Sequence, residues 1–268
     1  GEEAVGLDLL YGVLLPSGAE CCLTFAERIA GSEEAFVDMM NEKAKELGME
    51  HTHFTNSTGL QDEDHYSTVR DISVLLRYAL AGDTFRQVFT SSSYSTNPSA
   101  CHPEGFTFVS TMFQEMSSAQ VNGGEILGGK TGYTKDAGLC LASLAVIDGK
   151  EYILVTAHAN GNHETKQYHV QDAVKVYDQT VKAERFYTKR RFSMKVTKGL
   201  KFVSGCDMLF SEFKERCSDE KIIYFLKTCG NWKNGTISYR MFVMLSEDRL
   251  YSQEPSFSVL SGFIFARI

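Results

Sequence analysis

The segment with the clearest chemical potential is Gly-Gly-Lys-Thr-Gly-Tyr-Thr at residues 128–134. On an exposed strand, Lys130 would offer a fixed cation for a carboxylate, and the hydroxyl of Thr131 would add a second hydrogen bond. Gly132 lacks the side chain that would keep a peptide from lying beside the strand edge. The segment therefore predicts a binding site for the carboxylate end of a peptide. Taken alone, a solvated lysine on an edge strand is the simpler interpretation of so short a triplet.

Two further segments carry polar side chains that could act chemically. Ser17 lies in a Pro-Ser-Gly turn directly before an apolar helix, a position at which serine is ordinarily the N-cap. Residues 52–68 include Asn56 and Asp62 in a stretch rich in Ser, Thr and Asn, a composition typical of a loop that ends in a helix cap. Neither segment predicts a catalytic site by itself.

Three helices are predicted in the first part of the chain. Apolar residues at helical spacing place two of them at 20–30 and 33–47, and Gly48 suits the position just after the second helix. The third begins near Thr68, with Ser67 as its N-cap. The first of these helices follows the Ser17 turn directly, so it would hold that hydroxyl in place.

Extended segments follow and change the texture of the chain. Strands are expected at 126–134, 139–147 and 151–157, the last two joined by Asp-Gly at 148–149, which is a strong hairpin signal. The second and third strands are almost continuously apolar, as in a sheet covered by helices on both faces. A helix over 167–183 completes the pattern, and the fold class is α+β.

Composition excludes several classes of protein. The chain has 268 residues, of which 43% are hydrophobic and 23% charged, and no run of about 18 apolar residues predicts a transmembrane helix. Residues 181–268 carry 16 Lys and Arg against 9 Asp and Glu, whereas residues 1–180 carry 11 against 25. This asymmetry predicts a domain boundary near residue 180. The longest basic run has three residues, so nucleic acid is not an expected partner.

The cysteines and histidines predict no metal site. The 7 cysteines form no Cys-x-x-Cys pair, and no histidine lies in a His-Glu-x-x-His motif. Buried free thiols are the expected state of the cysteines, because their number is odd and Cys21 and Cys22 are adjacent. We expect neither a metal nor another cofactor.

Taken together, the landmarks resemble the serine D-alanyl-D-alanine carboxypeptidases, which are the low-molecular-mass penicillin-binding proteins. The resemblance covers about residues 5–180 and rests on four segments. These are Leu-Leu-Tyr-Gly at 9–12, the helix that starts Gly-Ser-Glu-Glu-Ala-Phe-Val at 31–37, the loop with Asn-x-x-Gly-Leu and His-Tyr-Ser-Thr at 56–68, and Gly-Gly-Lys-Thr-Gly-Tyr-Thr at 128–134.

The resemblance implies acyl transfer by a serine nucleophile in a fold like that of β-lactamases and penicillin-binding proteins. Ser17 matches the serine of the family's Ser-x-Asn motif, which passes a proton to the leaving D-alanine amine. Lys130, Thr131 and Gly132 match the Lys-Thr-Gly motif, which grips the terminal carboxylate of the substrate. The implied partners are peptidoglycan stem peptides ending in D-Ala-D-Ala, with β-lactams as inhibitors. The implied carboxypeptidase domain is residues 1–183.

Two departures from the family pattern stand out. The asparagine of Ser-x-Asn falls on Ala19, which can neither orient a lysine nor hydrogen-bond a substrate amide. The nucleophile motif, Ser-x-x-Lys, is expected some tens of residues before Ser17, so we expect this domain to be incomplete at its N-terminus. The matches at Ser211-x-x-Lys214 and Ser218-x-x-Lys221 have the wrong order and a charged context, and they are expected by chance.

The departures leave alternatives open. A non-catalytic module that binds stem peptides or penicillin through Lys130 and Thr131 is one, and a β-lactamase is another, although the His-Tyr-Ser-Thr loop resembles carboxypeptidases more. The substrate implies an extracytoplasmic location, although the sequence shows no export signal. Residues 184–268 have no assigned role, but 222–226 and 237–245 could form a small β unit, and their basic excess could favour peripheral contact with membrane or wall.

Overall fold

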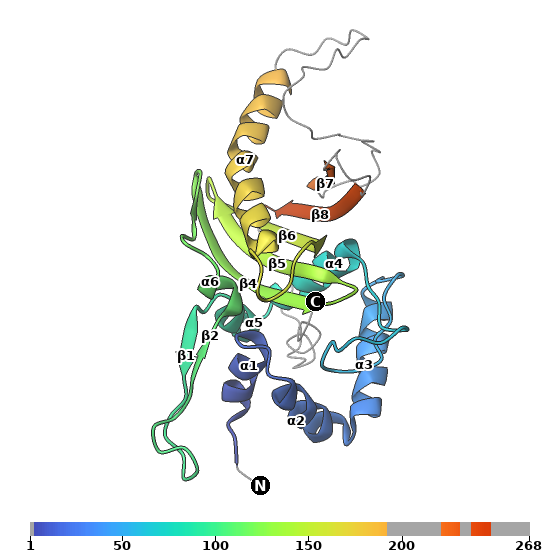
Figure 1. The fold of residues 1–268 in the computed structure, drawn as a ribbon, viewed down its shortest axis with the longest axis vertical. Coiled ribbons are helices and arrows are strands. Elements are labelled where there is room, and N and C mark those ends of the chain that lie inside the picture. The colour runs from blue at the N-terminus through green and yellow to red at the C-terminus, as the bar shows by residue number, and fades with distance from the viewer. Residues whose placement is uncertain (1–2, 192–220, 231–236, 248–268) are drawn as a thin grey trace.

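The computed structural model describes residues 3–191, 221–230 and 237–247, with side chains up to Thr180. Five helices come first along the chain, followed by a small hairpin, a short helix, four strands of a sheet, a long helix and two more strands (Figure 1). The elements are α1 (Gly6–Leu14), α2 (Ala19–Ala30), α3 (Glu33–Glu46), α4 (Val69–Leu80), α5 (Asp83–Phe89), β1 (Ser93–Ser95), β2 (Thr107–Val109), α6 (Thr111–Gln114), β3 (Gln120–Val121), β4 (Gly124–Thr134), β5 (Gly138–Ile147), β6 (Lys150–Ala159), α7 (Tyr168–Arg191), β7 (Lys221–Gly230) and β8 (Ile237–Glu247).

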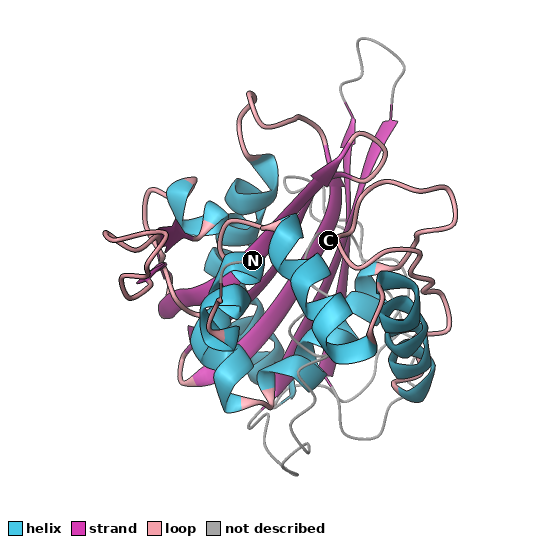
Figure 2. Ribbon diagram, turned by 90° about the horizontal axis from the view of Figure 1, so that it is seen from below, coloured by secondary structure: helices cyan, strands magenta, loops and turns pink. Residues whose placement is uncertain are grey.

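The large sheet separates two apolar cores. Its six strands follow the order β3-β4-β5-β6-β8-β7, and all neighbours are antiparallel. Because successive side chains of a strand point to opposite faces, Ala142 and Leu144 of β5 pack with the N-terminal helices, whereas Leu141 and Ala145 pack under α7. Helices therefore lie on both sides of the strands, as Figure 2 shows. This arrangement explains the almost continuously apolar central strands.

The predicted helices are present, with one correction at a cap. Helix α3 starts at an N-cap Ser32, whose hydroxyl accepts from the backbone N–H of Ala35 at 3.2 Å. Helix α4 is capped by Thr68 and not by the predicted Ser67. The hydroxyl of Ser67 is instead hydrogen-bonded to that of Thr52 at 2.8 Å. The contact with Thr52 therefore engages Ser67, and Thr68 caps α4.

The predicted strands and their hairpin are present as well. Asp148 and Gly149 have φ angles of 49° and 76°, as a two-residue turn with left-handed backbone requires. Helix α7 continues to Arg191 and crosses the expected boundary at 183. The two expected C-terminal strands are β7 and β8, and β8 pairs with β6 in the large sheet. The division into residues 1–183 and 184–268 stays a prediction, and most of the second part lies outside the described residues.

Within the part of the chain that the structure describes, no helix is long and apolar enough to cross a membrane. The same residues contain no group of three or more His, Cys, Asp or Glu side chains that could hold a metal ion. The four described cysteines are free, and Cys22 and Cys140 are buried as expected. Cys101 is exposed, contrary to that expectation, because it lies in the loop between β1 and β2.

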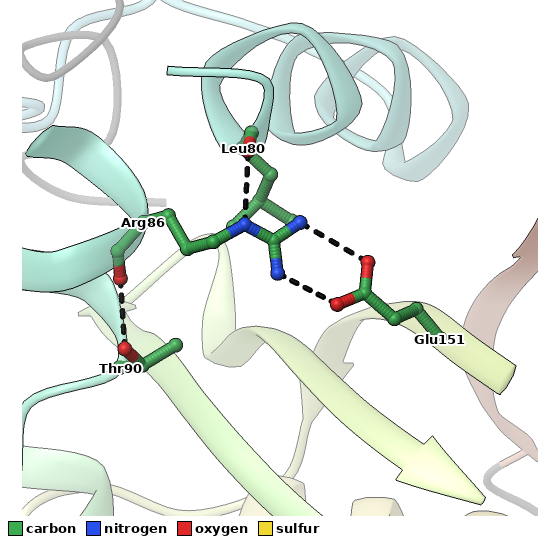
Figure 3. A network of polar contacts seen from close by, with 4 residues as sticks. All are labelled: Leu80, Arg86, Thr90 and Glu151. Carbon is green, nitrogen blue, oxygen red and sulfur yellow. Dashed lines mark hydrogen bonds and ion pairs between the residues drawn. The ribbon is translucent and has the colours of Figure 1, made fainter. Parts of the chain in front are cut away.

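A bidentate ion pair fastens the helical layer to the sheet. The guanidinium of Arg86, on α5, donates to both carboxylate oxygens of Glu151, on β6, at 2.7 and 3.1 Å (Figure 3). Its Nε donates to the carbonyl of Leu80, the last residue of α4, at 3.2 Å. The hydroxyl of Thr90 donates to the carbonyl of Arg86 at 2.8 Å. One side chain thus joins the end of α4, α5 and the start of β6.

We expect Glu151→Gln or Arg86→Leu to lower the free energy of unfolding by about 1–3 kcal/mol, because each leaves a partly buried partner with unmet hydrogen bonds. Urea denaturation measures the change. The exposed Glu46, paired with Lys43 on α3, supplies the control. Its Glu46→Gln variant should change stability by no more than about 0.5 kcal/mol. Equal losses for Glu46→Gln and Glu151→Gln would contradict the structural role of the pair.

The underside of α7 buries polar groups against the sheet. The hydroxyl of Tyr177 lies 3.0 Å from that of Ser143, on β5. His169, in the first turn of α7, is 2% exposed, and its Nδ1 has no hydrogen-bond partner among the described residues. Desolvation, followed by the charge of His163, lowers the pKa of His169 from 6.5 to about 4. His169 is therefore neutral in the folded protein at neutral pH.

His169 should make the protein less stable in acid. Between pH 6.5 and about 4 the unfolded chain binds a proton at this imidazole that the folded chain does not bind. The free energy of unfolding should therefore fall as pH falls through this window, by up to about 1.4 kcal/mol per pH unit from this group. His169→Gln should reduce this slope relative to the wild type in denaturation series at several pH values. A slope in His169→Gln identical to that of the wild type would refute the assignment.

Candidate active site

The turn that carries Ser17 connects α1 to α2. Ser17 has a φ of 66°, in the left-handed region that residues other than glycine rarely adopt. The structure corrects the expectation that Ser17 is a helix cap, because the N-cap of α2 is Gly18 and no side chain caps this helix. The Ser17 hydroxyl instead accepts a hydrogen bond from the ammonium of Lys130. The strained backbone thus aims this hydroxyl at β4 and away from its own helix.

Two glycines let α1 and α2 approach closely enough to form this turn. The N–H of Gly18 donates to the carbonyl of Gly12 at 2.8 Å. A Cβ on Gly18 would lie 2.9 Å from that carbonyl oxygen, and a Cβ on Gly12 would lie 2.6 Å from the Sγ of Cys21. A side chain at Gly18 would therefore push α2 away from α1 and move Ser17, whereas one at Gly12 would require the Cys21 side chain to move.

Lys130 is buried, which corrects the expectation of an exposed lysine. Only 1% of the residue is exposed, and it is paired in register with Ala142, whose side chain belongs to the core under the N-terminal helices. Its side chain therefore points from β4 into the helical layer. The ammonium donates to the hydroxyl of Ser17 and to the carbonyl of Thr131, the latter at 2.5 Å. The site thus joins residues 113 positions apart.

The glycine pair before Lys130 has a structural explanation. A Cβ on Gly128 would lie 2.2 Å from the carbonyl oxygen of Phe89, at the end of α5. A Cβ on Gly129 would lie 2.4 Å from the Sδ of Met112, on α6. These glycines admit two helices against β4 and so fix the strand on which Lys130 lies.

The other two residues of the triplet, Thr131 and Gly132, follow Lys130 on β4. Thr131 is partly buried, and its hydroxyl lies 2.5 Å from that of Thr111, the first residue of α6. Gly132 is buried in β4 and is paired in register with Cys140. The structure therefore brings Ser17, Lys130 and Thr131 together, with Gly132 next along the strand.

Sequence analysis missed Thr111. The residue lies in a helix of four residues, which has no hydrophobic periodicity to reveal it. Its N–H donates to the carbonyl of Leu15 at 3.2 Å, so it contacts the Ser17 turn as well as Thr131. The adjacent hydroxyl residues Ser110 and Thr111, between β2 and β3, are a sequence signal that could have indicated it.

The loop at 52–68 holds itself together and supplies no group to this site. The side chain of Asn41, on α3, bonds both the N–H and the carbonyl of Phe54, at 2.9 and 2.8 Å. Glu33 accepts from the N–H and the hydroxyl of Ser57 at 2.9 and 2.7 Å. Asn56 accepts from the N–H groups of residues 58 and 60. The interpretation of Asn56 as a turn residue is confirmed.

The site offers one buried cation, Lys130, bonded to the Ser17 hydroxyl, and a separate pair of hydroxyls, Thr131 and Thr111. The Lys130 ammonium can attract a carboxylate, and the Thr131 and Ser17 hydroxyls can donate or accept one proton each. Ala19, the first residue of α2, lies two positions after Ser17 and offers only a methyl group.

Comparison with known sequences identifies relatives for the first 161 residues. Residues 1–161 match the family model described as D-alanyl-D-alanine carboxypeptidase. The chain is 37% identical over 145 residues to D-alanyl-D-alanine carboxypeptidase DacF of Bacillus subtilis, which covers 54% of this chain and 36% of that protein. It is 30% identical over 162 residues to D-alanyl-D-alanine carboxypeptidase DacD of Escherichia coli, and the match covers 60% of this chain and 39% of that protein. The chain thus spans less than half the length of these relatives.

Solved structures share the fold. The D-alanyl-D-alanine carboxypeptidase of Mycobacterium tuberculosis matches with a TM-score of 0.55 and 28% identity, over 66% of this chain and 64% of that chain. A DD-transpeptidase of Streptomyces K15 matches in fold with a TM-score of 0.56 at 24% identity, over 65% and 66%. These matches confirm the expected transpeptidase-like α+β fold. Since the family model covers more than half of its residues, the chain belongs to the D-alanyl-D-alanine carboxypeptidase family.

Proposed function

We propose that the chain acts in a serine D-Ala-D-Ala carboxypeptidase, as the part that binds the terminal carboxylate and relays a proton. The observation that carries this proposal is the hydrogen bond from the Lys130 ammonium to the Ser17 hydroxyl. It places a fixed cation beside a hydroxyl that is free of any capping role. The substrate would be a peptidoglycan stem peptide ending in D-Ala-D-Ala, and β-lactams would be inhibitors.

The reaction divides into two steps. A serine hydroxyl attacks the carbonyl carbon of the penultimate D-alanine, an ester bond forms, and the peptide bond breaks. In this proposal the attacking serine gives up its hydroxyl proton, Ser17 relays a proton to the leaving D-alanine amine, and Lys130 attracts the carboxylate. Water then hydrolyses the ester and restores the serine. The attacking serine would come from a Ser-x-x-Lys segment, and residues 3–191 contain none.

A binding module without catalysis is the second candidate. Ala19 favours it, because a methyl group cannot hydrogen-bond the amide backbone of a substrate as an asparagine side chain can. In this case Lys130 and Thr131 would still hold the carboxylate, and no bond would break. An in-frame Ser-x-x-Lys upstream of the codon for Gly1 would favour the enzyme, and its absence would favour the module.

An extracytoplasmic location follows from the proposed substrate, since stem peptides lie outside the cytoplasmic membrane. Contact of the basic C-terminal part with membrane or wall rests on its charge alone, and most of that part lies outside the described residues.

Removal of the Lys130 cation should weaken binding of a D-Ala-D-Ala peptide. We expect Lys130→Met to raise the dissociation constant about 10-fold to 100-fold, as the loss of a charged hydrogen bond implies. Methionine keeps the length of the buried stem. Lys135→Met is the control, because Lys135 is exposed just beyond the end of β4. Isothermal titration gives affinity, and an assay for released D-alanine gives activity.

The outcomes separate the candidates. Binding with release of D-alanine supports the enzyme, and binding without release supports the module. Absence of both in the wild-type chain and in the complete gene product would refute both candidates, as would equal affinities for Lys130→Met and the wild type.

An asparagine at position 19, as in the family's Ser-x-Asn motif, should strengthen binding of the D-Ala-D-Ala peptide. Asparagine at position 19 suits the start of α2, where the residue is partly exposed. We expect Ala19→Asn to lower the dissociation constant for the same peptide about 3-fold to 10-fold, the gain of one hydrogen bond. Ala19→Leu is the control for size and should bring no gain. If Asn and Leu have the same effect, the amide is not the missing group.

A further inference from the structure

Thr111 contacts both halves of the candidate site. Its backbone N–H donates to the carbonyl of Leu15, two residues before Ser17, at 3.2 Å. Its hydroxyl lies 2.5 Å from the hydroxyl of Thr131, the residue after Lys130. It is thus the residue through which α6 touches both the Ser17 turn and the Lys-Thr-Gly strand.

The direction of the hydroxyl hydrogen bond matters to a ligand. In a pair of hydroxyls one donates and the other accepts, and each has a single proton. A carboxylate can only accept, so Thr131 must keep its proton for the ligand. Thr131 can do so only when it accepts the proton of Thr111. If Thr131 donated to Thr111, its oxygen would present lone pairs to the carboxylate, and the two would repel.

The surroundings hold Thr111 in place before any ligand arrives. Met112, the next residue, is 0% exposed and packs at Gly129, where a Cβ would lie 2.4 Å from its sulfur. Ser110, the preceding residue, is buried, and its N–H donates to the carbonyl of Ser92 at 2.8 Å. With both neighbours fixed, the Thr111 hydroxyl has a defined position relative to β4.

We propose that Thr111 is a positioning residue that acts through Thr131. It donates its hydroxyl proton to the Thr131 oxygen, which directs the Thr131 proton toward the carboxylate of the peptide. The residue thereby sets the preference for a free carboxylate over a carboxamide, because a carboxamide can also donate to a Thr131 oxygen that is not so directed. This inference rests on the proposed function of Lys130 and Thr131.

The test compares Thr111→Val, which removes the hydroxyl at equal shape, with Thr111→Ser, which keeps it. Dissociation constants are measured for a peptide ending in D-Ala-D-Ala and for the same peptide with a C-terminal amide. Thr111→Val should weaken binding of the acid peptide about 3-fold to 10-fold and should reduce the ratio of its affinity to that of the amide peptide. In Thr111→Ser the affinity for the acid peptide and this ratio should both return to the wild-type values. Thr107→Val is the matched control, because the Thr107 hydroxyl pairs with Ser95 at 2.8 Å on the β1–β2 hairpin.

The outcomes distinguish this inference from the proposed function. If Lys130→Met loses affinity but Thr111→Val keeps both the affinity and the acid preference, the inference is wrong and the proposed function stands. If wild-type chain binds neither peptide, the proposed function fails. The side-chain coupling constants of Thr131, measured by NMR, test directly whether the Thr111 hydroxyl fixes the Thr131 side chain. A single Thr131 rotamer in the wild type and in Thr111→Ser, with rotamer averaging in Thr111→Val, supports the inference. Identical coupling constants in all three proteins overturn it.

Discussion

The hydrogen bond between Lys130 and Ser17 is the contact on which the site depends. It places an ammonium group at the junction of β4 and the α1–α2 turn, in a residue with 1% exposure. Burial of a charge is costly unless hydrogen bonds compensate, and here a hydroxyl and the carbonyl of Thr131 accept from it. A carboxylate ligand would add the opposite charge that such a position favours.

Close approach of helices to β4 keeps this contact in register. Gly128 and Gly129 admit α5 and α6, while Gly12 and Gly18 admit α1 to α2. At Gly18, Gly128 and Gly129 an added Cβ would lie within 3.0 Å of backbone atoms, so packing between elements explains these three glycines. The Arg86–Glu151 pair fixes α5 to β6, so that α5 presents Phe89 to β4 from a fixed position. The polar site therefore depends on backbone clearances that lie outside it.

The sequence predicted four of the helices, α2, α3, α4 and α7, and the strands β4, β5 and β6, because their signals are local. Apolar spacing located α2 and α3, and Asp-Gly located the β5–β6 turn. The Lys-Thr-Gly motif also indicated Lys130 and Thr131 as candidate site residues. The sequence could not predict the burial of Lys130 or the role of Thr111, because both depend on partners far along the chain. The predicted N-cap of α4 was wrong for the same reason, because the hydroxyl of Ser67 is hydrogen-bonded to that of Thr52.

The left-handed backbone at Ser17 restricts how this position can change over evolution. Threonine is the usual replacement for a serine hydroxyl, but its branched Cβ is strained at a φ of 66°. Glycine and asparagine tolerate this backbone, and both lack the hydroxyl. Substitution by glycine would thus relax the turn and remove the group that accepts the hydrogen bond from Lys130, and asparagine would keep an acceptor but lose the hydroxyl proton. Of the two small hydroxyl-bearing side chains, serine lacks the branched Cβ of threonine, so it keeps the contact with Lys130 at the smaller backbone strain.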